Sequence, residues 1–230
     1  MKIELSGKLA LVTGSTGGIG KAIVKGLAAT GAQVVINGRR QQSVDNAMRW
    51  TFVNNAGVFE PKSFFEIPDE DWLRLFQINV LAGVRLSRAY MRAMLSRNWG
   101  RIVFISSESA LNIPKEMIHY GFTKAGELAV ARGLAQLTAG TAVTVNSVLP
   151  GPTRSDGVEA FLAKMAERSG KSVNEMAADF VKEYRPTSLL QRFARVEEVA
   201  NMVVYAASKE ASATNGAALR VDGGIVQTIV

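Results

Sequence analysis

Short runs of apolar residues alternate along the chain with stretches in which apolar side chains recur every three or four positions. Most of the short runs are continuously apolar, which is typical of strands in a parallel sheet that is covered on both faces. The alternation predicts an α/β fold with a doubly wound parallel sheet in three layers, α/β/α. The strands are expected at Leu9–Thr13, Gln33–Asn37, Thr51–Asn54, Arg101–Ser106, Ala142–Val148 and Ala217–Val221.

Helical periodicity is clearest after the first strand. There Ile19, Ile23 and Leu27 are spaced by four residues until Gly31 ends the pattern. A longer helix is expected over Asp69–Arg97, because its first residues are acidic and suit a helix N-terminus. Further helical segments are expected at Met117–Leu137 and Val196–Ala207, and as an insertion at Arg154–Pro186.

One polar residue, Asn79, falls on the apolar stripe of the long helix. A buried amide that lacks a partner costs roughly 2 kcal/mol or more, so Asn79 is expected to be hydrogen-bonded. Its partner can be structural or part of a functional site. The stripe consists of Trp72, Phe76, Asn79, Gly83, Leu86 and Tyr90.

Composition narrows the class of protein. The 230 residues are 47% hydrophobic and 20% charged, which predicts a single domain, 1–230, with a sizeable core. The chain has no cysteine and one histidine, His119, so no metal site is expected. The apolar run Leu9–Val12 is too short for a signal segment, and no run approaches the length of a membrane helix. We therefore expect a cytoplasmic protein with no membrane contact.

The formal net charge of +7 suggests either an anionic partner or an ordinary basic surface. Lysine and arginine are dispersed and form no basic tail. For this reason we expect no nucleic-acid partner.

Four glycines lie close together where the first strand ends, in the segment Gly14-Ser15-Thr16-Gly17-Gly18-Ile19-Gly20. The strict G-x-G-x-x-G pattern is not matched, because the spacing here is G-x-x-x-G-x-G. Glycines nevertheless permit a tight turn and close approach of a ligand to the backbone, while the following helix offers free N–H groups to a pyrophosphate. The segment predicts dinucleotide binding on a Rossmann-type sheet; a merely flexible turn is the alternative.

The second strand ends in "VVINGRR" and carries no acidic residue where NAD-binding sites place one. Arg39 stands nearby instead, and an arginine there accommodates the 2′-phosphate of NADP(H). NADP(H) is therefore favoured over NAD(H). The alternative is that Arg39 and Arg40 are solvated loop charges.

Tyr120 and Lys124 are four residues apart and so share one helix face. An ammonium beside a phenol favours the phenolate and lowers a pKa that ordinarily lies near 10. The pair is thus a candidate for acid–base chemistry, with an ordinary surface pair as the alternative.

In these features the chain resembles the short-chain dehydrogenase/reductases, in the branch that includes 3-oxoacyl-carrier-protein reductases. The resemblance spans nearly the whole chain. It depends on the glycine segment, Asn54-Asn55-Ala56-Gly57, Asn79, Ser107, Tyr120-x-x-x-Lys124, Pro150-Gly151 and the closing "RVDGG".

The resemblance implies an enzyme that interconverts a carbonyl and a secondary alcohol on a small-molecule substrate. Tyr120 would carry the proton, and Lys124 would lower its pKa and hold the nicotinamide ribose. Ser107 would bind the substrate oxygen, with Ser106 as the alternative, and Asn79 would order a water beside Lys124. A nucleotide-binding regulator without catalysis, on the same fold, is the alternative function.

The resemblance also implies where the cofactor lies. Asn55, Ala56 and Gly57 would follow its adenosine side, and Pro150, Gly151 and Thr153 would contact its nicotinamide. The 154–186 insertion would close over a substrate with an apolar part. A homotetramer or homodimer is implied, in which helices Asp69–Arg97 and Met117–Leu137 pair between subunits.

The chain departs from the family between its second and third strands, where one edge strand and helix are missing. Few residues separate Asn37 from Thr51, and a parallel crossover needs about a dozen. Either the protein lacks this unit, or residues between Trp50 and Thr51 have been left out of the sequence. The abrupt end of the helical pattern before Trp50 favours omission.

Overall fold

The computed structural model describes residues 2–37 and 50–229. Its main sheet has six parallel strands in the order β2-β1-β3-β4-β5-β8, so the predicted doubly wound sheet is confirmed. Each predicted strand is present within one or two residues of its expected ends. The strands are β1 (Leu9–Val12), β2 (Gln33–Ile36), β3 (Trp50–Asn54), β4 (Gly100–Ile105), β5 (Val143–Pro150) and β8 (Ala218–Val221).

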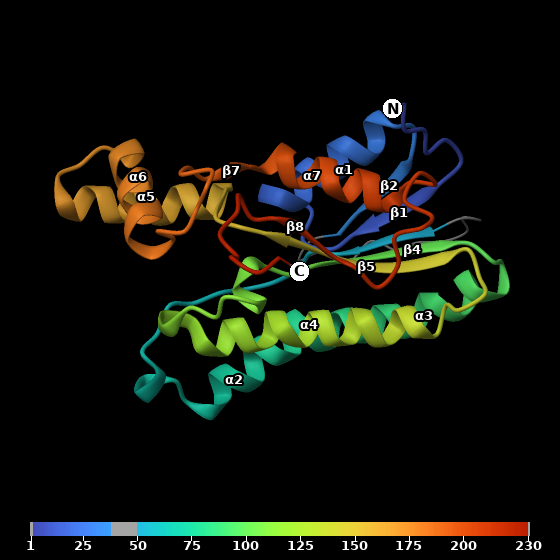
Figure 1. Cartoon of the computed structure of the whole chain (residues 1–230), viewed down its shortest axis with the longest axis horizontal. Coiled ribbons are helices and arrows are strands. Elements are labelled where there is room, and N and C mark those ends of the chain that lie inside the picture. The colour runs from blue at the N-terminus through green and yellow to red at the C-terminus, as the bar shows by residue number, and fades with distance from the viewer. Residues whose placement is uncertain (1, 38–49, 230) are drawn as a thin grey trace.

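Helices cover both faces of the sheet, as three layers require (Figure 1). On one face α1 (Gly18–Ala29) and α7 (Val196–Ala207) pack Ile23, Leu27 and Val203 against Val12, Val53 and Val103. On the other face α3 (Ala82–Ser96) and α4 (Ile118–Gln136) pack Met91, Met94 and Ala131 against Phe52, Ile102 and Phe104. No helix within the described ranges is both long and apolar enough to cross a membrane.

The expected insertion forms two helices, α5 (Asp156–Ser169) and α6 (Val173–Tyr184), which extend beyond the sheet at the left of Figure 1. They bury a small core of their own, around Leu162, Met176 and Val181. A capping box at Ser172 and Glu175 starts α6, because each side chain bonds the backbone N–H of the other. Two short strands, β6 (Thr153–Arg154) and β7 (Ala194–Arg195), pair at the base of this segment.

The long helix expected over Asp69–Arg97 is not a single α-helix. It begins as α2 (Asp69–Leu75), passes through a π-helical segment, Phe76–Leu81, and continues as α3. The wider turn changes which residues face the sheet: Leu75, Asn79, Gly83, Ser87 and Met91 are buried. Trp72, Phe76, Leu86 and Tyr90 of the predicted stripe are only half-buried. A π turn carries an extra residue, so a periodicity drawn for an α-helix cannot locate it.

The omission of residues between Trp50 and Thr51 stays a prediction. The two residues are consecutive in one strand and pair with Leu9 and Ala10, which are consecutive in β1. Among the described residues, β3 is the strand that follows β2 along the chain, and it pairs with β1 on the side opposite β2. This leaves β2 as an edge of the sheet.

Candidate active site

The glycine turn leads from β1 into α1 and requires glycine for two different reasons. Gly14 and Gly18 adopt positive φ angles, 60° and 52°, which residues with a side chain rarely adopt. Gly20 instead needs space, since a Cβ there would lie 2.5 Å from the Asn55 amide nitrogen. The Asn55 amide in turn donates to the Thr13 and Gly14 carbonyl oxygens, at 2.9 and 3.1 Å. The turn is thus fixed against the end of β3.

Hydrogen bonds anchor the turn at two further points. The Thr13 hydroxyl accepts from the backbone N–H groups of Asn55 and Ala56, both at 2.9 Å. The Ser15 hydroxyl donates to the Asn37 carbonyl oxygen and accepts from the Asn37 N–H. Thr16 is exposed in the same turn. Arg39, the residue expected at the 2′-phosphate, lies outside the described residues.

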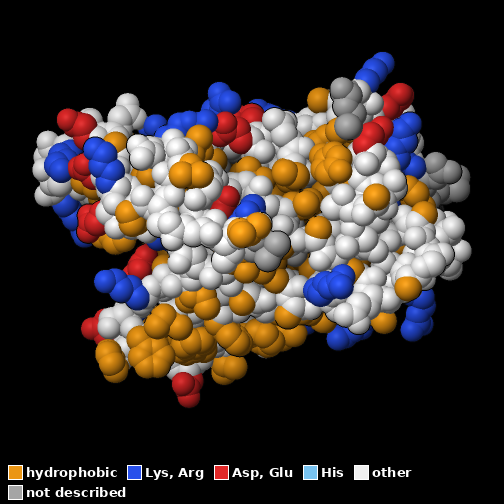
Figure 2. Space-filling model, viewed as in Figure 1, with side chains coloured by type: hydrophobic (Ala, Val, Ile, Leu, Met, Phe, Trp, Pro, Cys, Tyr) orange, Lys and Arg blue, Asp and Glu red, His pale blue; other side chains and the backbone are white. Residues whose placement is uncertain are grey.

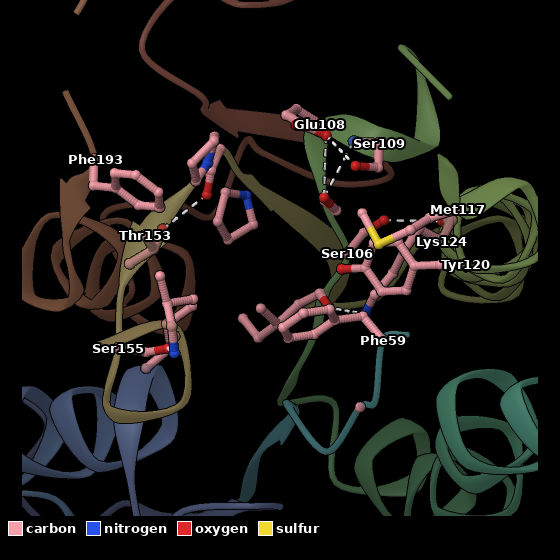
Figure 3. Close-up of a pocket in the computed structure, with 18 of the residues that line it drawn as sticks. Phe59, Ser106, Glu108, Ser109, Met117, Tyr120, Lys124, Thr153, Ser155 and Phe193 are labelled. Atoms are coloured by element: carbon pink, nitrogen blue, oxygen red, sulfur yellow. Dashed lines mark hydrogen bonds between the residues drawn. The ribbon is translucent and has the colours of Figure 1, made fainter. Parts of the chain in front are cut away.

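A pocket of about 240 Å³ opens between the carboxyl ends of the strands and the α5–α6 segment. Figure 3 shows Tyr120 and Lys124 on one side, from α4, with Thr153, Ser155 and Phe193 across from them. The expected site residues that line it are Ile19, Asn55, Gly57, Ser107, Tyr120, Lys124, Pro150, Gly151 and Thr153. The expected residues Gly14, Ser15, Thr16, Gly18, Gly20, Ala56 and Asn79 lie outside its lining.

Tyr120 stands in the first turn of α4, beside the turn that follows β4. Close packing of these two elements depends on Gly121, because a Cβ there would lie 3.0 Å from the Ser109 carbonyl oxygen. The Ser107 hydroxyl hydrogen-bonds with the Tyr120 phenol. The alternative residue, Ser106, donates its hydroxyl to the Lys124 carbonyl oxygen at 2.9 Å. The structure therefore associates Ser107, rather than Ser106, with the phenol.

The expected lowering of the Tyr120 pKa is wrong as a net effect. Burial raises the pKa of the phenol, and this outweighs the lowering by the Lys124 ammonium and by the hydrogen bond with Ser107. Glu127 and Glu108 raise it further. Lys124 thus acts in the predicted direction, but the sequence pattern does not show how far the surrounding residues desolvate the half-buried phenol.

Lys124 is 4% exposed, and its ammonium is held on three sides. It donates to the Ile105 carbonyl oxygen at 2.9 Å and to the two carboxylate oxygens of Glu127 at 3.0 and 3.2 Å. Its nitrogen lies 5.6 Å from the centre of the Tyr120 ring. Burial alone lowers the pKa of Lys124, but Glu127 and Tyr120 together keep it above its ordinary value.

Asn79 is buried in the π-helical segment, and its amide is fully hydrogen-bonded. The amide oxygen accepts from the Val58 N–H at 2.8 Å, and the nitrogen donates to the Val58 carbonyl oxygen and the Thr123 hydroxyl, both at 3.0 Å. These bonds fix the chain after β3 against α4, one residue before Lys124. They give Asn79 a structural role; the water-ordering role remains a prediction.

The far wall of the pocket is held by the last strand. The Gly151 N–H donates to the Val221 carbonyl oxygen at 3.1 Å. A Cβ at Gly151 would lie 2.8 Å from the Asp222 carbonyl oxygen, so only glycine allows this approach. The Thr153 hydroxyl donates to the Gly151 carbonyl oxygen at 2.9 Å. The closing "RVDGG" segment thus positions Pro150, Gly151 and Thr153.

Sequence reasoning missed a buried ion pair that lines the pocket. The Arg185 guanidinium lies 2.6 Å from one carboxylate oxygen of Glu108, and the other oxygen accepts from the Ser107 and Ser109 hydroxyls. The two residues are 77 positions apart, so no local pattern connects them. The apolar lining of the pocket was predicted only in part. Phe161 and Phe180 belong to the insertion that was expected to cover the substrate, whereas Phe59 and Met117 were not expected to line the pocket.

Comparison with known proteins agrees with this geometry. Residues 8–50 match the family model described as short chain dehydrogenase, and residues 50–226 match that of Enoyl-(Acyl carrier protein) reductase. The two matches meet at residue 50, the first residue of β3. The chain is 43% identical to YvaG of Bacillus subtilis, an uncharacterized oxidoreductase, with all of both chains covered. That alignment has 263 positions against 230 residues here, a difference of 33.

Two further relatives have named activities. The 3-oxoacyl-[acyl-carrier-protein] reductase FabG of Escherichia coli is 30% identical, over 97% of this chain and 99% of its own. The crystal structure of L-sorbose reductase from Gluconobacter frateurii, complexed with NADPH and L-sorbose, has a TM-score of 0.91 at 27% identity and full coverage of both chains. The chain therefore belongs to the short-chain dehydrogenase/reductase family of oxidoreductases.

Proposed function

We propose that the protein is an NADP(H)-dependent oxidoreductase that interconverts a carbonyl and a secondary alcohol. The observation that carries this proposal is the arrangement of Ser107, Tyr120 and Lys124. All three line one pocket, which is also lined by Ile19 of the glycine turn and Thr153 after β5. A hydroxyl, a phenol and an ammonium at one end of a parallel sheet can bind and protonate a carbonyl oxygen.

The proton step follows from the state of the phenol. Because burial keeps the Tyr120 pKa high, the phenol is protonated at neutral pH and can donate to a carbonyl oxygen. The Ser107 hydroxyl is placed to bind the same oxygen, and the Lys124 ammonium stabilises the phenolate that Tyr120 becomes. The cofactor, when bound, supplies the hydride for the carbonyl carbon. In alcohol oxidation the same residues act in reverse.

The glycine turn fits the charge of a dinucleotide. The first N–H of α1, from Gly18, already binds an anion, the Asp156 carboxylate at 3.2 Å. A pyrophosphate would use the same helix N-terminus. Asn55, Ala56 and Gly57 would follow the adenosine side, and Pro150, Gly151 and Thr153 the nicotinamide. NADP(H) rather than NAD(H) is supported by Arg39 in the sequence and by NADPH in the L-sorbose reductase complex.

The pocket supports a small substrate with an apolar part. Phe59, Met117 and Phe161 provide apolar surface, while Glu108 and Arg185 form one charged corner beside Ser107. We propose that α5 and α6 act as a lid over this substrate. The FabG likeness favours an acyl chain as the substrate, and the L-sorbose reductase likeness favours a sugar.

We also propose a homodimer or homotetramer that pairs α2–α3 and α4 between subunits. Figure 2 shows hydrophobic side chains gathered over α2 and the beginning of α4, at the lower left. Exposed residues there include Phe65, Leu73 and Phe122, with 94%, 62% and 51% exposure. An oligomer would bury them. Light scattering after size-exclusion chromatography measures the assembly; a monomer at micromolar concentration would contradict it.

The decisive experiment follows NADPH oxidation with a panel of carbonyl compounds, including acyl ketones and keto sugars. Turnover in the native protein is expected to be lost in Tyr120→Phe while NADPH still binds. Tyr205→Phe is the matched control. Tyr205 is on α7, and its hydroxyl lies 3.4 Å from the Thr214 hydroxyl rather than in the pocket. Full turnover in Tyr120→Phe contradicts the acid–base role of Tyr120. No turnover of the native protein with any carbonyl, despite tight NADPH binding, favours the regulator.

A further inference from the structure

Glu127 is a buried acidic residue in contact with the catalytic machinery, and the proposed reaction does not use it. It lies on α4, three residues after Lys124, and is 3% exposed. Both of its carboxylate oxygens accept from the Lys124 ammonium. A buried carboxylate costs free energy unless it is paired with a positive charge. The charges of Glu127 and Lys124 therefore stabilise each other.

The arrangement uses all the donors of the ammonium. An ammonium has three N–H groups, and here they are directed to Ile105 of β4 and to the two oxygens of Glu127. The Glu127 carboxylate therefore helps to fix the position of the ammonium. It also brings a negative charge close to the positive charge that acts on Tyr120.

The ionisable groups around this pair are few. Tyr120 lies one helical turn before Lys124 on the same helix, and Glu108 follows β4. Glu108 is itself paired with Arg185 of the segment after α6. Asn79, from the π-helical segment, faces the same region but does not ionise. Within the described part of the chain, Glu127 is the acidic side chain that contacts Lys124 directly.

We propose that Glu127 is a positioning residue of the catalytic centre, which fixes the Lys124 ammonium through both carboxylate oxygens and offsets the charge that this ammonium presents to Tyr120. The inference rests on the proposed function. Its physical basis is that the favourable effect of Lys124 on the phenolate is reduced by an adjacent carboxylate, since opposite charges at short range partly cancel.

Burial raises the pKa of Glu127 to about 7, against the lowering effect of Lys124. This agrees with a carboxylate that depends on one partner. The same carboxylate raises the pKa of Tyr120. Glu127 thereby favours the protonated phenol, which is the form that donates to a carbonyl.

The test is Glu127→Gln, which keeps the shape and removes the charge. The pH profile of kcat/KM for alcohol oxidation has a rising limb as Tyr120 ionises. In Glu127→Gln this limb is expected to move to lower pH by about one unit, because the Lys124 charge is no longer offset. An unchanged limb, or one displaced to higher pH, overturns the proposal.

Glu127→Asp separates position from charge. The shorter side chain keeps the carboxylate but cannot hold the ammonium in the same place, so kcat is expected to fall about tenfold with the limb unmoved. An unchanged kcat overturns the positioning claim. Glu4→Gln is the matched control. Glu4 is exposed near the N-terminus and accepts from the Ser6 hydroxyl, and neither quantity is expected to change.

A spectroscopic titration keeps the inference independent of the substrate. Phenolate absorbance is followed in the native protein and in Glu127→Gln, and the titration of the matching Tyr120→Phe protein is subtracted from each. The Tyr120 phenolate is expected at lower pH in Glu127→Gln, and equal titrations overturn the proposal. Should Glu127→Gln not fold, Glu127→Met carries the same expectation. Turnover in Tyr120→Phe would contradict the proposed function alone. Equal phenolate titrations of the native protein and Glu127→Gln would contradict this inference alone.

Discussion

The Asp156 carboxylate, on the first residue of α5, accepts a hydrogen bond of 3.2 Å from the backbone N–H of Gly18, the first residue of α1. It occupies the helix N-terminus that a pyrophosphate would use. A bound pyrophosphate would have to displace this carboxylate and would be repelled by it. Asp156→Asn is therefore expected to tighten NADPH binding about two- to fivefold at low salt.

The measurement is a fluorescence or calorimetric titration with NADPH at low and high ionic strength. The gain should shrink at high salt, because exposed charges are screened. Asp69→Asn serves as the control, since Asp69 is an exposed carboxylate on α2, across the sheet from the glycine turn (Figure 1). Weaker binding in Asp156→Asn would show that the contact supports the cofactor site instead.

The crowded side of the glycine turn gives a second prediction. A Cβ at Gly20 would lie within 2.5 Å of the Asn55 amide nitrogen and closer still to the Gly14 carbonyl oxygen. Gly20→Ala is therefore expected to lower the free energy of unfolding by about 1–3 kcal/mol and to weaken NADPH binding. Chemical denaturation and the NADPH titration measure the two effects.

Gly133 provides the matched control for this change. It also lies within a helix, α4, but a Cβ there would have no atom within 4 Å. Gly133→Ala is expected to raise the free energy of unfolding by about 0.5–1 kcal/mol, because alanine loses less backbone freedom on folding. If both variants change stability alike, the close approach at Gly20 is not what requires glycine.

The sequence predicts this fold well because its main signals are local. Continuous apolar runs such as that of β5 mark buried parallel strands, and Gly14 to Gly20 mark the turn into α1. The π-helical segment around Asn79 was missed, because one extra residue in a turn leaves no local signature. Asn79 itself was correctly predicted to be hydrogen-bonded, although its partners, Val58 and Thr123, could not be named.

The electrostatics of the site were harder to predict than the identity of its residues. Tyr120 and Lys124 were identified from the resemblance to the family together with their spacing. The net direction of the Tyr120 pKa depends on burial, which only the fold determines. The Glu108–Arg185 pair joins distant parts of the chain and has no sequence signal. The continuity of β3 at Trp50 likewise required the strand pairing.

The raised pKa of Tyr120 leads to a prediction about reaction direction. Carbonyl reduction needs the protonated phenol, which persists to a pH above the ordinary value of 10.0. Reduction should therefore be nearly independent of pH around neutrality as far as Tyr120 is concerned, while alcohol oxidation should increase tenfold per pH unit until the phenol ionises. Initial rates of kcat/KM in both directions measure this. Equal pH profiles in the two directions would contradict an acid–base role for Tyr120.

His119, next to Tyr120, gives a prediction about stability and pH. Its ring is fully buried, lies 5.9 Å from the Trp72 ring, and has no hydrogen-bond partner for either nitrogen among the described residues. Burial lowers the pKa of His119 from its ordinary value of 6.5, which outweighs the raising effect of Asp71. The unfolded chain therefore takes up the proton first as pH falls, and the folded state loses stability below about pH 6.5.

His119→Phe keeps a flat ring beside Trp72 and removes the titrating group. The free energy of unfolding of the native protein, minus that of His119→Phe, is expected to be constant above pH 7 and to fall between pH 7 and pH 5. The comparison is clean because His119 is the single histidine of the sequence, and carboxylates titrate alike in both proteins. Urea denaturation at several pH values measures the difference. A difference that is constant down to pH 5 would mean that protonation of the buried ring costs no stability there, in conflict with its burial.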